Sequence, residues 1–290
     1  MNNLKKLFLF IASVLLIIVL FSFVMNSISE PSVDVSVDNI LQNYFSSHTM
    51  KKNNDIDFDT YFTENDFIRL KQKLPILDEV RFELSSDKLE LYEKLTPNDS
   101  TIVIYPIFTS AAYSDSGFYD FFSGDCDESC LNNISFKNPD INYDSSGITT
   151  QILHIIGYDF ITDIDVDKNP DILKNYQTVI LLHNEYVTKK MFDAITSHPN
   201  LIFLSPNALY AEIEVDYNND TIKLIRGHDY PPGVSNGFGY EIEEQFHKYE
   251  SDGLCLDWEF FEIKNGYHLN CYPDGSIHFN LELIAKIKEL

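Results

Sequence analysis

The sequence predicts an α/β domain with a doubly wound, mostly parallel sheet, and three observations support this. From Thr101 onward, short apolar runs alternate with amphipathic segments, which is typical of parallel strands joined by helices. The runs at 178–182 and 201–204 are apolar throughout, as strands buried on both faces are. Between them, apolar residues recur at helical spacing, namely Val187, Met191 and Ile195. We therefore expect the order strand, helix, strand in this part of the chain.

The other elements of the predicted domain, residues 100–290, continue this alternation. TIVIYP at 101–106 is expected to be a strand, and the segments TTQILHII and YDFITDID follow at 149–156 and 158–165. A polar stretch from Phe108 to Gly147 separates the first strand from the next element. Loops of that length are usually functional or disordered, so this one resembles a lid over a strand end. The alternative is an ordered surface loop held by one disulfide.

An uncharged run near the N-terminus predicts a membrane anchor at residues 7–25. As a helix it is about 28 Å long, which matches the hydrocarbon thickness of a bilayer. Two lysines precede it and acidic residues follow, so the positive-inside rule puts residues 1–6 in the cytoplasm and the main domain outside. A cleaved signal peptide is the alternative, although its apolar region is usually shorter. We expect a single-pass protein of the cell membrane.

Two further segments lie between the anchor and the main domain. Residues 26–54 are rich in Ser, Asn and Asp with little periodicity, which predicts a stalk. Residues 55–99 contain capping residues in TEND at 63–66 and apolar residues near helical spacing. This pattern predicts a small helical lead-in.

Charge and motif content exclude several classes of function. The chain has 45 acidic and 21 basic residues, a formal net charge of −24, which would repel phosphate backbones and anionic lipid headgroups. Nucleic acid is therefore not an expected partner. No G-x-S-x-G or G-x-C-x-G motif follows a predicted strand, which argues against serine hydrolase and glutamine amidotransferase chemistry.

Four cysteines agree with an oxidising exterior. Pairing Cys126 with Cys130 and Cys255 with Cys271 requires the least rearrangement of the chain, because each pair flanks a short segment. A zinc site at the first pair is the alternative. Three N-x-S/T sequons would accept glycans on a glycosylated surface: Asn98, Asn133 and Asn219.

Polar residues directly after the strand at 178–182 form the candidate site. Ligands of open α/β sheets bind beyond the carboxyl ends of the strands, where His183 and Glu185 lie. In extended backbone the two side chains share a face, so His183 could exchange a proton there. Alternatively, Glu185 stabilises the N-terminus of the next helix, whose expected N-cap is Thr188. His228, before two prolines, either approaches the same site or belongs to a turn.

Several segments together resemble one known family. HNEYVTKKMFDAI and LIFLSPNALYAEI are similar to its HxEYW…M+DAI and SGNxxYWR motifs. Further pieces follow the family's order: FTSAAYSDSGFY at 108–119, ISFKNPD at 134–140, HIIGYDFITDID at 154–165 and YPDGSIHFNLELIAKI at 272–287. Over about residues 100–290 the chain resembles the catalytic domain of the large (beta) subunit of N,N-dimethylformamidase and its relatives.

The resemblance implies a fold, a cofactor and a set of ligands. The family has a glutamine-amidotransferase-like α/β fold and a mononuclear iron, held by two tyrosines and one glutamate, that activates water for amide hydrolysis. Glu185 matches the glutamate, His183 a neighbouring histidine and Tyr113 one tyrosine. At the position of the second tyrosine this chain has Asp140, and Tyr143 follows three residues later.

The sequence thus supports two functions. The first is a membrane-anchored, extracytoplasmic, metal-dependent amidohydrolase acting on small C–N compounds, with iron as the expected metal. The second is a catalytically inactive surface binding or structural module of the same fold. The altered second tyrosine, and SHPN at 197–200 in place of the family's glycine pair, would allow the second.

Overall fold

The computed structural model describes residues 36–40, 51–54, 57–62, 80–98, 100–137, 139, 141, 143–240, 248 and 252–290, all within one unit from Ser36 to Leu290. The predicted cytoplasmic tail and membrane anchor lie outside these residues. Within the described ranges, no helix is both long and apolar enough to cross a bilayer.

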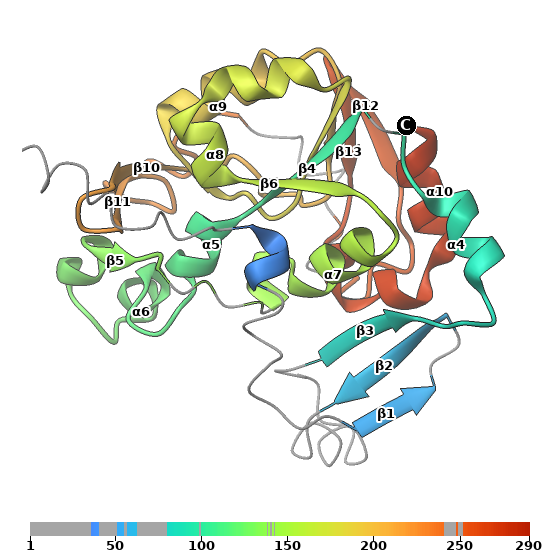
Figure 1. Cartoon of the computed structure of the whole chain (residues 1–290). Helices are drawn as coiled ribbons and strands as arrows, with labels where there is room; N and C mark the ends of the chain where they lie inside the picture. The colour runs from blue at the N-terminus through green and yellow to red at the C-terminus, as the bar shows by residue number, and fades with distance from the viewer. Residues whose placement is uncertain are drawn as a thin grey trace, which may run out of the picture. The chain divides into compact units, whose positions relative to one another are not determined.

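A six-stranded sheet forms the centre of the domain (Figure 1), with strand order β12-β13-β9-β7-β4-β6. Every neighbouring pair is parallel except β12 with β13. The predicted α/β class with a mostly parallel sheet is therefore confirmed. The strands are β4 (Thr101–Tyr105), β6 (Asp159–Thr162), β7 (Thr178–Leu181), β9 (Leu201–Phe203), β12 (Phe260–Ile263) and β13 (Gly266–Leu269).

Helices cover both faces of this sheet because the chain reverses direction after its first crossover. It moves from β4 to β6 through α7 (Gly147–Ile155), and then back past β4 to β7 through α8 (Asp163–Lys168). Right-handed crossovers in opposite directions put the helices on opposite faces. Figure 1 accordingly shows α8 with α9 (Lys189–Thr196) on one side and α7 on the other.

The strand, helix, strand unit predicted around residues 178–204 is present as β7, α9 and β9. Thr188 is the N-cap of α9, and its hydroxyl accepts a hydrogen bond from the Met191 amide at 3.1 Å. Met191 and Ile195 are fully buried, as is Val187 just before the helix. These three side chains belong to the core, as their spacing predicted.

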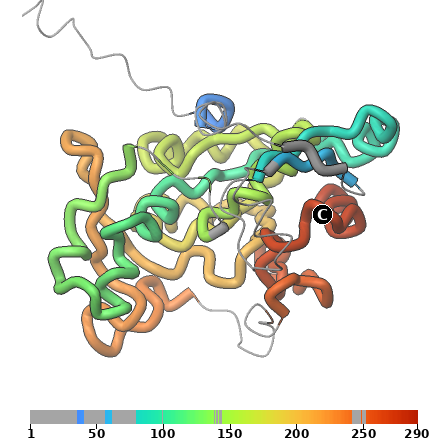
Figure 2. The backbone as a smooth tube through the Cα atoms, turned by 90° about the horizontal axis from the view of Figure 1, so that it is seen from below, coloured from blue at the N-terminus to red at the C-terminus, as the bar shows by residue number. Residues whose placement is uncertain are grey.

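A second sheet of four strands carries further residues of the site. Its order is β5-β11-β10-β8. Both views show the green α6–β5 segment beside the orange strands β10 and β11 (Figures 1 and 2), which agrees with the antiparallel pairing of β5 with β11. The strands are β5 (Ile134–Ser135), β8 (Tyr186–Val187), β10 (Ala211–Asp216) and β11 (Thr221–Arg226).

The segment before residue 100 differs from the prediction of a stalk and a helical lead-in. Its described part forms an antiparallel sheet of β1 (Lys51–Asn54), β2 (Phe58–Phe62) and β3 (Val80–Leu84), followed by α4 (Leu89–Leu95), which packs against α10 (Leu281–Glu289). The reason is a two-residue period of burial at Val80 and Phe82, which suits a strand. The Gln151 side chain in α7 also binds the backbone of both residues. The helical spacing at 63–79 lies outside the described residues.

The stretch expected as one long loop is largely structured. It contains α5 (Ile107–Ala112), α6 (Phe118–Ser123) and the short 3-10 helices η1 (Glu128–Leu131) and η2 (Tyr143–Ser145). Buried Phe108, Phe118 and Leu131 explain why it folds against the domain. Later 3-10 turns are η3 (Pro170–Asn175), η5 (Pro273–Gly275) and η6 (Ile277–Phe279).

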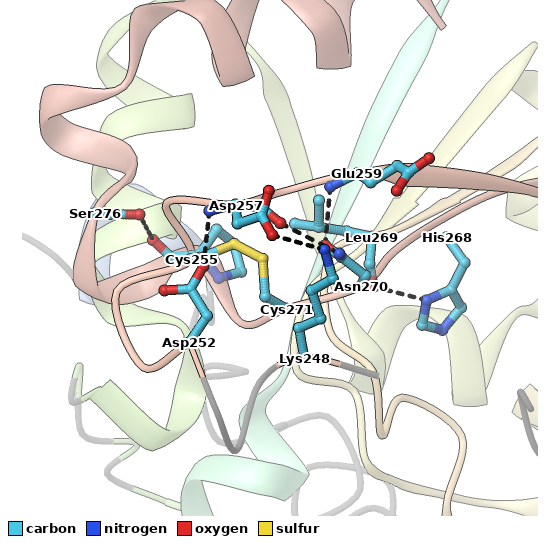
Figure 3. Close-up of a disulfide and its surroundings, with 11 residues drawn as sticks. Lys248, Asp252, Cys255, Asp257, Glu259, His268, Leu269, Asn270, Cys271 and Ser276 are labelled. Carbon is cyan, nitrogen blue, oxygen red and sulfur yellow. Dashed lines mark hydrogen bonds and ion pairs between the residues drawn. A yellow bond between two sulfur atoms is a disulfide. The ribbon is translucent and has the colours of Figure 1, made fainter. Parts of the chain in front are cut away.

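Both expected disulfides are present, and no cysteine is free. Pairing of Cys126 with Cys130 removes the thiolates that the alternative zinc site would need. Figure 3 shows the second bond, Cys255 to Cys271, beside the Asn270 backbone. The three sequon asparagines, at positions 98, 133 and 219, are all exposed.

We expect the two disulfides to differ in their contribution to stability. The Cys255–Cys271 bond closes 16 residues and the Cys126–Cys130 bond only 4. Loop-closure entropy assigns about 3 kcal/mol to the first and about 2 kcal/mol to the second. Urea unfolding of the two double-serine variants should show a larger loss for positions 255 and 271, and the reverse order would contradict this explanation.

Candidate active site

The candidate site lies where the carboxyl ends of the parallel strands meet. The strand order reverses between β4 and β7, which is the position where ligands of doubly wound sheets bind. Tyr113 ends the helix that follows β4, and Glu185 lies in the turn that follows β7. Asn207 follows β9. These three residues are distant in sequence, but they lie close together because each follows one of three neighbouring strands.

Glu185 is the centre of this cluster, and four side chains contact its carboxylate. Its Oε2 accepts a hydrogen bond from the Tyr113 hydroxyl at 2.9 Å and lies 3.2 Å from His183 Nε2. Its Oε1 accepts from Asn207 Nδ2 at 3.1 Å and lies 2.7 Å from His228 Nε2. The Glu185 side chain is fully buried. A carboxylate with donors on both oxygens is held in one orientation.

The backbone of the turn that carries Glu185 is held from two other segments. The Thr109 hydroxyl in α5 accepts from the amides of Glu185 and Tyr186, at 3.1 and 3.4 Å. The Glu185 carbonyl accepts from the amides of Tyr210 and Ala211. The side chain is therefore oriented by a rigid turn.

Helix α5, which ends at Tyr113, is itself anchored by a residue of another strand end. The fully buried Asp163, directly after β6, accepts a hydrogen bond from the Phe108 amide at 2.8 Å. This carboxyl satisfies an amide of the first helical turn that has no partner within the helix. The position of the Tyr113 hydroxyl thus depends on β4, β6 and β7 together.

His183 is fixed on three sides. Its amide donates to the Ser146 hydroxyl at 3.0 Å, and its ring Nδ1 contacts the Asp144 carbonyl oxygen. A carbonyl oxygen only accepts, so Nδ1 carries the proton and Nε2 faces Glu185. The Tyr272 ring packs against the imidazole edge-to-face, with centroids 5.1 Å apart. The orientation of the imidazole is therefore set by its surroundings.

His228 reaches the cluster from a separate loop after β11. Both His228 and Asp229 have left-handed backbone, with φ of 55° and 62°. Non-glycine residues adopt that conformation at a cost of about 1 kcal/mol each, and it often marks functional sites. The His228 side chain is 21% exposed, compared with 7% for His183. His228 is therefore the more accessible of the two imidazoles.

The charges of the cluster are coupled. Burial alone would raise the pKa of Glu185, but hydrogen bonds and positive charge from His183 and His228 outweigh it and lower that pKa to about 2. Burial alone would lower the pKa of His183, but the hydrogen bond and charge of Glu185, with the Asp144 carbonyl, raise it. The structure thus favours a carboxylate beside an imidazolium.

Two tyrosines extend the network outward. The hydroxyl of Tyr119, in α6, lies 2.5 Å from that of Tyr113, and their rings stack with centroids 4.0 Å apart. Because Tyr113 donates its only proton to Glu185, Tyr119 donates to the Tyr113 oxygen. Burial, followed by the negative charge of Glu185, raises the pKa of both phenols.

The structure brings together three of the residues expected from the sequence, Tyr113, His183 and Glu185, and adds His228. Glu185 therefore does not merely stabilise the N-terminus of α9. Asp140 lies outside the described residues. The backbone of Tyr143 belongs to η2, but its side chain is also outside the described part.

Sequence reasoning did not assign roles to Tyr119, Asn207, Thr109 or Ser146. Asn207 could have been found, since SPN directly follows a buried strand that neighbours β7. Tyr119 carried no signal, because one tyrosine among 17 is uninformative without its neighbours in space.

Among the described residues, no three His, Cys, Asp or Glu side chains are grouped so that they could hold a metal ion. The model of the family described as N,N-dimethylformamidase beta subunit-like, C-terminal, matches residues 82–239, more than half of the chain. The chain belongs to this family.

Membership of the N,N-dimethylformamidase beta subunit-like, C-terminal family relates the chain to amide hydrolases. The matched residues include Glu185 and its four contacting side chains. No curated protein sequence matches the chain significantly. The doubly wound sheet is present, whereas a closer likeness to the glutamine amidotransferase fold stays a prediction.

Proposed function

We propose that the chain is a hydrolase that cleaves the C–N bond of small amides at Glu185. The observation that carries this proposal is the convergence of a phenol, an amide and two imidazoles on one buried carboxylate at the switch point of the sheet. Family membership supports the reaction class. We propose small substrates because three tyrosine rings pack around His228 next to Glu185, namely Tyr119, Tyr186 and Tyr210.

The residues around Glu185 would fit a metal ion. His183 Nδ1 carries a proton, so its Nε2, which faces Glu185, could either carry a second proton or act as a metal ligand. Among the described residues, His183 Nε2 and His228 Nε2 have no hydrogen-bond partner other than the Glu185 oxygens, which lie 3.2 and 2.7 Å away. A proton or a metal ion can fill either contact. Glu185, Tyr113 and His183 would supply oxygen and nitrogen ligands suited to iron.

The residues of the chain then have distinct tasks. If bound there, a Lewis-acidic ion would lower the pKa of water toward neutrality and so make hydroxide available as the nucleophile. Asn207 Nδ2 and the Thr109 hydroxyl keep Glu185 in place through its side chain and its backbone. His228 Nε2, the more exposed imidazole nitrogen, is placed to pass a proton to the departing amine.

We also propose an extracytoplasmic, membrane-anchored location. Two disulfides with no free cysteine fit an oxidising compartment, and exposed sequon asparagines fit a surface that can be glycosylated. The anchor proposed at residues 7–25 would hold the domain at the membrane. Fractionation of cells with and without deletion of this run tests it: only the deleted chain should leave the membrane fraction.

An assay of the full chain tests the enzymatic proposal. Protein purified after growth with iron, or with zinc, is incubated with formamide, N-methylformamide and N,N-dimethylformamide, and formate is measured. We expect formate release and about one metal ion per chain, with Tyr113→Phe lowering the rate at least about a hundredfold. Tyr158→Phe, which removes a buried hydroxyl at the other end of the sheet, should leave the rate unchanged.

The metal itself offers a second readout. If iron binds through Tyr113, a visible phenolate-to-iron absorption band should appear in wild-type protein and in Tyr158→Phe, and be lost in Tyr113→Phe. A fully folded chain that binds metal but releases no formate from any of the three amides would favour the inactive binding module.

A further inference from the structure

The C-terminal segment adds contacts to the site that lie beyond the family match, which ends at residue 239. After β13 the chain passes through Cys271 and Tyr272 into η5. Tyr272 packs on the His183 ring, and its hydroxyl accepts a hydrogen bond from the Ser146 amide at 2.9 Å. This segment therefore contacts both His183 and the residue that holds the His183 backbone.

Ser146 connects Tyr272 to His183 through its hydroxyl and its amide. The Ser146 hydroxyl accepts from the His183 amide at 3.0 Å and lies 3.3 Å from the Tyr272 hydroxyl. Ser146 has left-handed backbone, with φ of 58°. Because that conformation is unfavourable for serine, the hydrogen bond from its amide to Tyr272 helps to keep it.

Helix α7 begins directly after Ser146, and it is capped from the same C-terminal segment. Ser146 occupies the N-cap position, but its side chain makes no capping hydrogen bond, because the hydroxyl is engaged with His183. The fully buried Asp274 instead accepts from the amides of Ile148 and Thr149, at 3.2 and 2.6 Å. Asp274 thus replaces the cap that Ser146 does not provide.

The Cys255–Cys271 disulfide holds this segment in place. Both cysteines are fully buried, and Cys271 immediately precedes Tyr272. Figure 3 shows Asn270, the residue before Cys271, bonded to its surroundings: its amide donates to the Glu259 carbonyl at 3.1 Å, and its Oδ1 accepts from the Glu259 amide at 2.9 Å. The backbone entering Tyr272 is therefore fixed covalently and by paired hydrogen bonds.

We propose that Tyr272 is a positioning residue of the active site: through Ser146 and through ring contact it holds His183 against Glu185, and the Cys255–Cys271 disulfide maintains this arrangement. Tyr272 acts through His183, which its ring contacts, and through Ser146, whose amide its hydroxyl binds. The proposal rests on the proposed hydrolase function for its kinetic consequence only. Its structural consequence, the orientation of the His183 ring, holds for any function of the site.

The test uses the full chain with Tyr272→Phe, which removes only the hydroxyl, and Tyr158→Phe as the matched control. The His183 Cε1–Hε1 signal is followed in NMR spectra of histidine-labelled protein and is assigned by its loss in His183→Gln. We expect this signal to shift or split in Tyr272→Phe and to stay unchanged in Tyr158→Phe. With N,N-dimethylformamide as the probe, kcat should fall about tenfold while KM changes less than about twofold.

A second variant and a reduced form of the protein test the same contact independently of Tyr272→Phe. Ser146→Ala removes the hydroxyl that joins Tyr272 to the His183 amide, so it should shift the same signal if Tyr272→Phe does not fold. Reduction of the Cys255–Cys271 disulfide by a phosphine should also shift the His183 signal. An unchanged His183 signal in a folded Tyr272→Phe or Ser146→Ala chain would overturn the proposal. If wild-type protein hydrolyses no amide but the signal still shifts, the proposed function fails and the positioning role stands.

Discussion

Replacing Glu185 with alanine is expected to destabilise the fold by about 3–5 kcal/mol, the range found when one partner of a buried ion pair is removed. Both imidazoles, the Tyr113 hydroxyl and the Asn207 amide would lose their acceptor. Because Glu185 is fully buried, water cannot readily replace the carboxylate. The same substitution should also release any bound metal.

The control for this variant is Glu214→Ala, at an exposed position of β10. Surface substitutions of this kind change stability by about 0.5 kcal/mol or less. The free energy of unfolding in urea and the metal content of both variants give the comparison. Equal stability and equal metal content in the two variants would show that the Glu185 network holds neither the fold nor an ion.

The second large effect is a loss of stability in acid that depends on Glu185. Its pKa falls from an ordinary 4.5 to about 2 in the folded protein. A carboxyl with a lowered pKa stabilises the fold above its unfolded value, and this contribution is lost as the pH falls from about 4.5 toward 2. The shift corresponds to about 3 kcal/mol. The pKa of His183 is raised in the folded protein, so the pH dependence of its contribution is the reverse. The stability that the protonated imidazole contributes to the fold is lost as the pH rises above that pKa.

Glu185→Gln removes this titration while keeping nearly the same volume. We expect the free energy of unfolding of wild-type protein to fall more steeply between pH 5 and pH 2.5 than that of the variant. Other carboxyl groups titrate in both proteins, so only the difference between the two curves reports on Glu185. Parallel curves would mean that Glu185 is not held as an anion by its imidazole neighbours.

The central sheet could be predicted because its strands are recognisable in the sequence as uninterrupted apolar runs. Residues 178–182 and 201–204 are apolar at every position, and burial on both faces of a parallel sheet requires that. The sheet of β1, β2 and β3 could not be predicted in the same way. Its strands are short, β2 and β3 alternate in burial, and β1 lies in a polar stretch that has the composition of a linker.

The site was partly predictable for a similar reason. His183 and Glu185 follow a recognisable strand, so their location at a strand end follows from the sequence. His228 reaches Glu185 through a loop with two consecutive left-handed residues, and Tyr119 stacks on Tyr113 across the turn between α5 and α6. Tyr272 arrives from another strand of the sheet. Such contacts depend on three-dimensional packing, and no local pattern of residues encodes them.

The proposed role of Glu185 in catalysis is tested by measuring amide hydrolysis by the full chain with wild-type sequence and with Glu185→Gln, both loaded with the same metal. Dimethylamine and formate released from N,N-dimethylformamide are quantified together, so that cleavage of the C–N bond is established by both products. We predict equimolar products with wild-type protein and a rate at least about a thousandfold lower with Glu185→Gln. Equal rates in the two proteins, or no release by metal-loaded, folded wild-type protein, would contradict the proposal that Glu185 is required for amide hydrolysis.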